Sequence, residues 1–208
     1  GDLDVSNTLP TADVLKKCAE LPVYDADGKQ HSFKSLVEGD GSGSKHMVIF
    51  IRHFFCGICQ EYVRTLASSF SSSTLPPSTA LTIIGCGSPD LISNYTAATS
   101  SAYKIYCDPK AKLYSTLGMQ RRLQMGPKKP DYIQNSMWIA SLKSVVQGLT
   151  WRGGRGALKG GDFSQNGGEF WFVRGEEGPL DGWNVEWCHR MRNTRDHVEV
   201  AELKKVMG

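Results

Sequence analysis

The stretch "HMVIFIRHF" at residues 46–54 most constrains how this chain can fold. It is an almost unbroken run of β-branched, aliphatic and aromatic residues, which is typical of a strand buried on both faces in an α/β sheet. Directly after it the apolar residues recur at helical spacing, at Val63, Leu66, Ala67 and Phe70. The sequence therefore predicts a buried strand followed at once by an amphipathic helix.

The alternation of strand and helix continues along the chain. "ALTIIGCG" and "YKIYC" predict two further strands. The helices expected after them are "SPDLISNYTAAT", capped by Ser88, and "DPKAKLYSTLG", capped by Asp108 with Pro109 at its first position. An amphipathic helix over 138–149 and a glycine-rich loop, "WRGGRGALKGGDFSQNGG", come next. A hairpin over "EFWFVRGEEGPLDGWNVEWCHRM" and a helix in "TRDHVEVAELKKVM" close the chain. This order predicts an α/β fold with a mixed sheet covered by helices on both faces.

The N-terminal part predicts a short helix in "TADVLKKCAEL" with Thr11 as its cap, and a tight hairpin in "LPVYDADGKQHSF". We expect residues 1–20 to form an N-terminal helical extension. Residues 21–208 are expected to form one domain, because a chain of 208 residues buries enough surface for a single core.

Composition argues against several classes of function. A net charge of +3 is too weak to favour nucleic acid as a partner, and no apolar run approaches the roughly 20 residues of a membrane span. The first residues, "GDLDVSNTLP", are polar and acidic, unlike a signal peptide. Without that signal, the six cysteines favour reduced thiols and a cytoplasmic protein.

Two cysteines stand three residues apart where the strand passes into the helix, in "HFFCGICQEY". Cys56 is expected at the helix start, where unpaired N–H groups and the helix dipole favour a thiolate. Arg52 and His53 just before it are expected to add positive potential. Cys59 follows one turn later, within reach of Cys56. The spacing is typical of an attacking thiol and a resolving thiol.

Other interpretations of the pair stay open at this point. A zinc site needs about four ligands, and Cys188 or His189 would have to complete it. A Cys–His hydrolase using His53 and a pair of inert core cysteines are two more. His189 and Arg190 are interpreted as a structural pair on a strand. The order of strand, cysteine pair and helix favours redox chemistry, which requires no metal or organic cofactor.

Four segments together resemble a known family: "HMVIFIRHFFCGICQEYVRTLA", "LTIIGCGSPDLISNYTAAT", "YKIYCDPKAKLYSTLGM" and "QNGGEFWFV" with its following hairpin and helix. The sequence is similar, from Leu21 onward, to peroxiredoxin-like proteins of the AhpC/TSA type, akin to the peroxiredoxin-like 2 group. The resemblance implies a thioredoxin-like fold, with Cys56 in the place of the attacking cysteine and Cys59 in that of the resolving one. It also implies an external thiol reductant, such as thioredoxin or glutathione.

Two positions depart from the peroxiredoxin pattern. Peroxiredoxins carry a proline seven residues before the attacking cysteine and a Thr or Ser three residues before it, and this sequence has Ile49 and His53 there. The hydroxyl that would orient a peroxide is therefore missing. This predicts weak peroxidase activity.

A third departure concerns the strand opposite the thiols. Thioredoxins place a cis-proline there, whereas this sequence has Gly167 and Gly168 before the "EFWFV" strand. Because glycine permits close approach of the backbone, we expect both to line the pocket, with N–H or C=O groups facing the sulfur of Cys56. Gly168→Val is then expected to impair thiol chemistry more than stability.

The sequence thus predicts a thiol–disulfide oxidoreductase or peroxiredoxin-like antioxidant enzyme acting through Cys56 and Cys59. Two alternatives remain. One is an enzyme of a specialised metabolic pathway that modifies a small molecule without net redox turnover, and the other is a non-catalytic redox-sensing binding module. The remaining cysteines fit small buried hydrophobic residues: Cys18, Cys86, Cys107 and Cys188.

Overall fold

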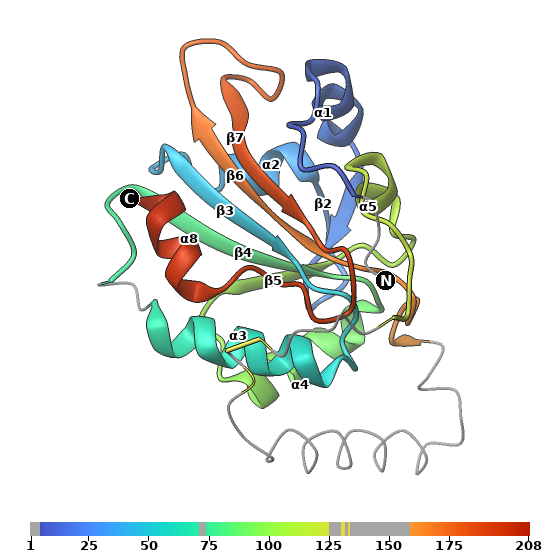
Figure 1. The fold of residues 1–208 in the computed structure, drawn as a ribbon. Coiled ribbons are helices and arrows are strands. Elements are labelled where there is room, and N and C mark those ends of the chain that lie inside the picture. Colours follow the sequence, from blue (N-terminus) through green and yellow to red (C-terminus); the bar gives the residue numbers. More distant parts are fainter. Residues whose placement is uncertain (1–4, 71–73, 125–129, 132, 134–158) are drawn as a thin grey trace.

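A computed structural model describes residues 5–70, 74–124, 130, 131, 133 and 159–208. Its centre is a seven-stranded sheet with the strand order β2-β1-β5-β4-β3-β6-β7 (Figure 1). The strands are β1 (Pro22–Tyr24), β2 (Gln30–Ser32), β3 (Lys45–Phe50), β4 (Thr79–Gly85), β5 (Lys104–Cys107), β6 (Gly168–Arg174) and β7 (Trp183–Arg190). Strands β3, β4 and β5 run parallel, and the other pairings are antiparallel. The sheet is therefore mixed, as the sequence predicts.

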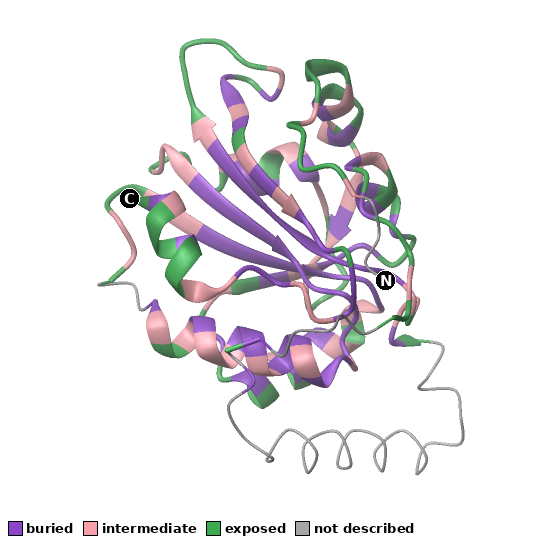
Figure 2. Cartoon of the chain, in the orientation of Figure 1, coloured by how far each residue is buried: buried purple, intermediate pink, exposed green. Residues whose placement is uncertain are grey.

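Helices cover both faces of this sheet (Figure 1). They are α1 (Ala12–Ala19), α2 (Phe33–Glu38), α3 (Gly57–Ser69), the 3₁₀ helix η1 (Pro89–Leu91), α4 (Ile92–Thr99), α5 (Lys112–Thr116) and α8 (Val200–Met207). Residues of α3, α4 and α8 form one apolar core with the sheet, and residues of α1, α2 and α5 form a second core on the opposite face. Figure 2 shows the buried residues along the strands and on the inner sides of the helices.

Strand β3 has the double burial that its sequence predicts. Met47 and Ile49 belong to the core beneath α3, whereas Val48 and Phe50 belong to the core beneath α1 and α2. All four side chains are fully buried. An alternating strand serves two cores only if both sets of side chains are apolar, which explains the unbroken hydrophobic run.

The N-terminal expectations are also confirmed. The Thr11 hydroxyl accepts a hydrogen bond from the N–H of Val14 and caps α1. Strands β1 and β2 pair around a turn in which Gly28 has a φ of +77°. Leu15 and Cys18 of α1 pack into the same core as the strands, and the division of the chain near residue 20 stays a prediction.

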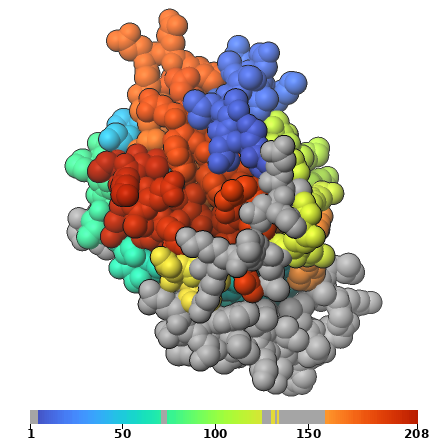
Figure 3. Space-filling model, in the orientation of Figure 1, coloured from blue at the N-terminus to red at the C-terminus, as the bar shows by residue number. Residues whose placement is uncertain are grey.

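The segment before α1 lies against the C-terminal hairpin (Figure 3). The guanidinium of Arg190 on β7 donates to the carbonyl oxygens of Ser6 and Thr8 at 2.9 and 3.0 Å, and its backbone N–H donates to the Asn7 side chain. The segment before α1 is therefore held against β7 by hydrogen bonds from Arg190.

Three helix assignments differ from the sequence prediction. The helix after β5 begins at Lys112, because 109–110 form a turn in which the Asp108 carboxylate accepts from the N–H of Leu113 at 2.7 Å. The last helix begins at Val200 rather than near residue 194. Helix α2 was not predicted, although Ser32 caps it and its apolar residues recur at helical spacing.

Ser88 precedes η1 and Pro89 occupies its first position, as expected, but the Ser88 side chain makes no capping hydrogen bond. The predicted helix over 138–149 and most of the glycine-rich loop lie outside the described residues. Within the described part of the chain, no helix is long and apolar enough to cross a membrane.

Candidate active site

Cys56 lies at the N-cap of α3, directly after the loop that follows β3. Its sulfur accepts a hydrogen bond from the backbone N–H of Cys59 at 3.3 Å. A thiol in this position faces the unpaired N–H groups of the first helical turn. The expected placement of the two cysteines, at the helix start and one turn later, is therefore present in the structure.

The two thiols have opposite electrostatic environments. The pKa of Cys56 is held well below its usual value by the hydrogen bond with Cys59, assisted by the Arg52 guanidinium, whose Nη1 lies 3.5 Å from the sulfur. Burial raises the pKa of Cys59 well above its usual value, and the neighbouring Cys56 raises it further. Within the pair, negative charge is therefore favoured on Cys56 and the proton on Cys59.

His53 differs from the sequence expectation. Its side chain is buried, and burial lowers its pKa to about 4, so that it is neutral at pH 7. Because a neutral imidazole contributes no net charge, Arg52 is the cation beside the Cys56 thiolate.

The described end of the glycine-rich loop covers this site. Arg52 Nη2 donates to the carbonyl oxygen of Phe163 at 2.5 Å, and the Phe163 ring meets the His53 ring edge-on at 4.6 Å. Gly161 lies so close to β4 that an added Cβ would stand 2.0 Å from the Cys86 carbonyl oxygen. Cys56 itself is 5% exposed.

A chain of buried polar groups lies behind Cys59. His197 Nε2 is 3.5 Å from the Cys59 sulfur, and His197 Nδ1 is 2.6 Å from Oε1 of Glu169. The other carboxylate oxygen, Oε2, is 2.8 Å from His189 Nδ1. His189 Nε2 in turn lies 3.4 Å from Asp196. Glu169, Asp196 and His197 were not predicted for the site, and His189 was considered there only as a zinc ligand.

Strand register explains how the chain of polar groups forms. Glu169 on β6 pairs with Ile49 of β3 and with His189 of β7. Trp171, two residues further along β6, belongs to the core beneath α3, so Glu169 faces α3 as well. Arg190 points to the opposite face, where it donates to the carbonyl of Leu117. His189 and Arg190 therefore do not form the pair that the sequence analysis expected.

Hydrogen bonds keep the network ionised despite its burial. Burial opposes ionisation of Glu169, but the bonds to His189 and His197 lower its pKa. Burial likewise opposes protonation of His189, but its bonds to Asp196 and Glu169 raise its pKa to about 9. At neutral pH the carboxylate of Glu169 thus faces a charged His189 on one oxygen and His197 on the other.

Gly167 precedes β6 at the end of the sheet where α3 begins, but its backbone does not face Cys56. Its N–H donates to the Met191 sulfur, and its C=O accepts from the Met191 N–H. An added Cβ would stand 1.9 Å from the carbonyl oxygen of Phe50. The expected backbone contact with the thiolate is therefore wrong, because the tight crossing of β3 and the segment after β7 uses both groups.

The same crossing changes the expectation for Gly168. A Cβ at Gly168 would stand 2.5 Å from the backbone oxygen of His189 on the paired strand. Gly168→Val would therefore push β6 and β7 apart and act mainly on stability, contrary to the sequence-based expectation.

The other four cysteines are buried and free, and burial raises the pKa of each thiol. They match the expectation of small hydrophobic residues. In the described ranges no group of three or more His, Cys, Asp or Glu side chains is arranged to hold a metal ion.

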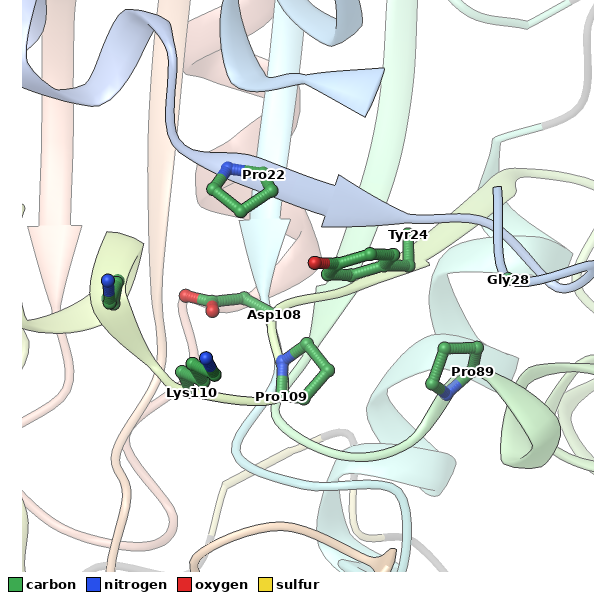
Figure 4. Close-up of a pocket in the computed structure, with 8 residues that line it drawn as sticks. Pro22, Tyr24, Gly28, Pro89, Asp108, Pro109 and Lys110 are labelled. Atoms are coloured by element: carbon green, nitrogen blue, oxygen red, sulfur yellow. The ribbon is translucent and has the colours of Figure 1, made fainter. Parts of the chain in front are cut away.

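One cavity of about 360 Å³ lies away from these groups (Figure 4). It is lined by Pro22, Tyr24, Gly28, Pro89, Asp108, Pro109, Lys110 and Lys112. Neither cysteine of the pair contributes to its walls, so this cavity is separate from the dithiol.

The fold and the site together define a class of protein. The sheet is mixed, helices cover both of its faces, and two cysteines lie at the start of the helix after β3. This arrangement is typical of a thioredoxin-like protein of the peroxiredoxin type. The model of the AhpC/TSA antioxidant enzyme family matches residues 65–193, and the chain belongs to this family. The matched region begins after the cysteine pair, so the chemistry rests on the geometry of the site.

Relatives and solved structures agree with this assignment. The chain is 33% identical over 193 residues to peroxiredoxin-like 2C of Homo sapiens. The aligned region covers 91% of this chain and 78% of the relative. The Mus musculus protein is 32% identical over the same length and with the same coverage. A peroxiredoxin-like protein from Aquifex aeolicus has a TM-score of 0.55 at 11% identity, covering 100% of this chain and 87% of its own. A peroxiredoxin 6 of Arenicola marina has a TM-score of 0.54 at 12% identity, covering 97% and 72%.

Proposed function

We propose that this protein is a thiol–disulfide oxidoreductase in which Cys56 attacks and Cys59 resolves. The observation that carries the proposal is the polarisation of the pair. The Cys56 sulfur caps α3, accepts a hydrogen bond from the Cys59 N–H at 3.3 Å and lies 3.5 Å from the Arg52 guanidinium. For Cys59, burial and the neighbouring Cys56 outweigh the effect of Arg52 and raise the pKa. A low pKa on the first thiol and a high pKa on the second suit a nucleophile and a resolving thiol.

The reaction with a disulfide substrate takes two steps. The Cys56 thiolate attacks one sulfur of the substrate, forms a mixed disulfide and releases one thiolate. Cys59 then loses its proton and attacks the Cys56 sulfur, which releases the second thiolate and leaves a Cys56–Cys59 disulfide. The substrate gains two electrons and the protein loses two.

Peroxide reduction would use the same pair. Attack of the Cys56 thiolate on a peroxide breaks the O–O bond and gives a sulfenic acid and an alcohol or water. Cys59 then displaces water to form the same disulfide. We propose peroxide reduction only as a weak activity of this chain, because Ile49 and His53 occupy the positions where peroxiredoxins carry a proline and a hydroxyl.

An external thiol would restore the reduced pair, and we propose thioredoxin or glutathione for this role. Arg52 and His53 would line the binding pocket for this thiol beside the attacking sulfur. Gly167 and Gly168 would lie behind it, where the start of β6 crosses the end of β3. Because Phe163 is held across the site by Arg52, a small thiol needs less displacement of the loop than a protein partner does.

The test is which disulfide forms first. After mild oxidation with one equivalent of a model disulfide, we expect Cys56–Cys59 to be the only readily reversible intramolecular disulfide, mapped by alkylation and mass spectrometry. Cys56→Ser should abolish it, whereas Cys18→Ala, which changes a buried thiol in α1, should leave it intact. Closure of another pair, or of none, would favour the alternative in which this site works without net redox turnover.

A further inference from the structure

The buried polar groups behind Cys59 have no role in the reaction as written above. Glu169 is 0% exposed, and so is the side chain of His197. Withdrawing a carboxylate from water costs several kcal/mol unless hydrogen bonds compensate. Here both oxygens are bonded to histidines, at 2.6 and 2.8 Å, and one of those histidines ends at the Cys59 sulfur.

The geometry points to His197 as the acid–base group of Cys59, with Glu169 as the residue that positions it. This inference rests on the proposed dithiol function and assigns the proton of its second step. His197 touches a reacting atom and is a catalytic residue in that sense, whereas Glu169 acts through His197.

The hydrogen-bond pattern assigns the tautomer of His197. An ionised carboxylate only accepts hydrogen bonds, so the Nδ1 that faces Glu169 carries the proton. The Nε2 lone pair then faces the Cys59 sulfur at 3.5 Å. The Tyr62 ring stacks on the imidazole with centroids 4.3 Å apart and planes 11° apart, which holds the ring in this direction.

Cys59 needs such a base because its thiol is fully buried and hard to ionise. As its sulfur bonds to the Cys56 sulfur, the proton passes to Nε2 of His197, and the bond from Cys56 to the substrate sulfur breaks. The departing thiolate takes the electron pair of that bond. Glu169 stabilises the resulting imidazolium, as a carboxylate does in other Cys–His and Ser–His sites.

Groups on three elements and two loops face this proton path. Arg52, on the loop after β3, favours the thiolate of Cys59 against the effect of burial. Cys59 and Tyr62 come from α3, Glu169 from β6 and His189 from β7. Asp196, on the same loop as His197, bonds to His189 from the other side. Because His189 stays protonated at neutral pH, Glu169 keeps its charge when His197 gains a proton.

The experiment separates the two steps in a single turnover. Reduced protein is mixed with one equivalent of 4,4′-dithiodipyridine, and the release of two molecules of thiopyridone is followed by stopped-flow absorbance. The first release reports attack by Cys56 and the second reports closure by Cys59. In His197→Gln we expect the second release at pH 7 to slow at least about 100-fold, the lower end of the usual contribution of a general base. The first release should stay within about twofold.

The pH dependence distinguishes proton transfer from packing. In wild-type protein the closure rate should rise less steeply than tenfold per pH unit, because His197 and not hydroxide takes the proton. In His197→Gln it should rise about tenfold per pH unit, because hydroxide must remove the proton. Glu169→Gln should slow closure, since the imidazolium loses the stabilising charge that lies 2.6 Å from its Nδ1.

His46→Gln is the matched control, because His46 is also a buried histidine in the sheet region. Its nitrogens lie 2.9 Å from the Val37 carbonyl oxygen and 2.8 Å from the Thr82 hydroxyl, with no cysteine among these partners. This variant should lose stability and keep the wild-type closure rate. If it slows closure as much as His197→Gln does, the effect is general loosening and the inference is wrong.

The remaining outcomes are also decisive. A second release that is equally fast in wild type and His197→Gln would overturn the inference and leave the proposed function standing. Absence of the second release in wild type would overturn both. If His197→Gln does not fold, the wild-type profile decides, because a wild-type closure rate that rises tenfold per pH unit would mean that hydroxide, and not a histidine, removes the proton.

Discussion

At the scale of residues, the site is a pair of cysteines whose different surroundings shift the pKa values of their thiols in opposite directions. The Cys56 sulfur lies 3.5 Å from the Arg52 guanidinium and 3.3 Å from a backbone N–H. The Cys59 sulfur is buried in the interior of the protein and lies 3.5 Å from a histidine nitrogen. The first environment stabilises a thiolate, and the second keeps a proton until a base removes it. The difference in role follows from this difference in surroundings.

Selective alkylation measures that difference. At pH 7 iodoacetamide should modify Cys56 at least about tenfold faster than Cys59, since only the thiolate reacts. In Arg52→Gln the pH dependence of Cys56 labelling should move to higher pH, because the pKa of Cys56 rises when the cation is lost. Faster modification of Cys59 than of Cys56, by peptide mapping, would reverse the assigned roles.

We predict weak peroxidase activity because of His53. It is buried and neutral at the position where peroxiredoxins place a hydroxyl, and its Nδ1 has no hydrogen-bond partner within the described residues. Stopped-flow oxidation of reduced protein by hydrogen peroxide should therefore be far below the diffusion limit.

A pair of variants of the same shape tests this explanation. His53→Thr should raise the rate of peroxide oxidation by about tenfold, because one well-placed polar group is worth at least that much. His53→Val, which has the same size but no hydroxyl, should not. Equal rates in the two variants, or a wild-type rate near the diffusion limit, would show that the hydroxyl is not what this site lacks.

At the scale of elements, the site is built where three segments cross at one end of the sheet. The loop after β3 carries Arg52 and Cys56, the described end of the glycine-rich loop covers them with Phe163, and the segment after β7 brings His197 beneath α3. Gly161 lies close against the end of β4, since a Cβ there would stand 2.0 Å from the backbone oxygen of Cys86. The cover over the thiolate therefore depends on a position that tolerates only glycine.

Gly161→Ala should loosen that cover. The new Cβ would stand 2.0 Å from the Cys86 oxygen at a φ of +95°, so stability should fall by on the order of 1–3 kcal/mol. Cys56 labelling should accelerate several-fold as Phe163 moves away. Gly175→Ala is the control, because its Cβ would meet nothing closer than 3.7 Å. Denaturant titration and timed alkylation measure both effects, and unchanged labelling in a destabilised Gly161→Ala would contradict the covering role.

At the scale of the whole molecule, one sheet separates two apolar cores, and the proposed dithiol site lies in one of them. The cysteine pair and the polar groups behind it lie on the face of α3 and α8, whereas the face of α1, α2 and α5 is packed by aromatic and aliphatic side chains. The ionised network joins β6, β7 and the loop before α8. Its protonation state therefore contributes to the stability of the whole fold.

The pH dependence of unfolding should report this contribution. The pKa of His189 is raised to about 9 in the folded protein, against about 6.5 for an unfolded histidine. Its stabilising effect is thus fully present below about pH 6.5 and is lost as pH rises through about 9. The difference in unfolding free energy between wild type and His189→Gln should shrink over this range, as measured by denaturant titration. A constant difference from pH 6 to 10 would show that His189 is not held protonated.

Much of the fold follows from local patterns in the sequence. The run at 46–54 predicts β3, because a strand buried on both faces is apolar at every position. The change to helical spacing of the apolar residues predicts α3 after it, because a helix buries only one stripe. The errors are also local: the cap at Asp108 belongs to a turn, and α8 starts late, since helix signals do not show which backbone groups a tertiary contact uses.

The sequence by itself determined the α/β class, the two-core sheet and the position of Cys56 and Cys59 at the start of a helix, because strand burial, helix period and capping act between near neighbours. Only the tertiary structure decided what surrounds the thiols. Glu169 and His197 are 110 and 138 residues from Cys59 along the chain. They meet it through the register of β6 against β3 and the path of the segment after β7. Residues so far apart leave no periodic signal, and their meeting is set by the packing of the whole molecule.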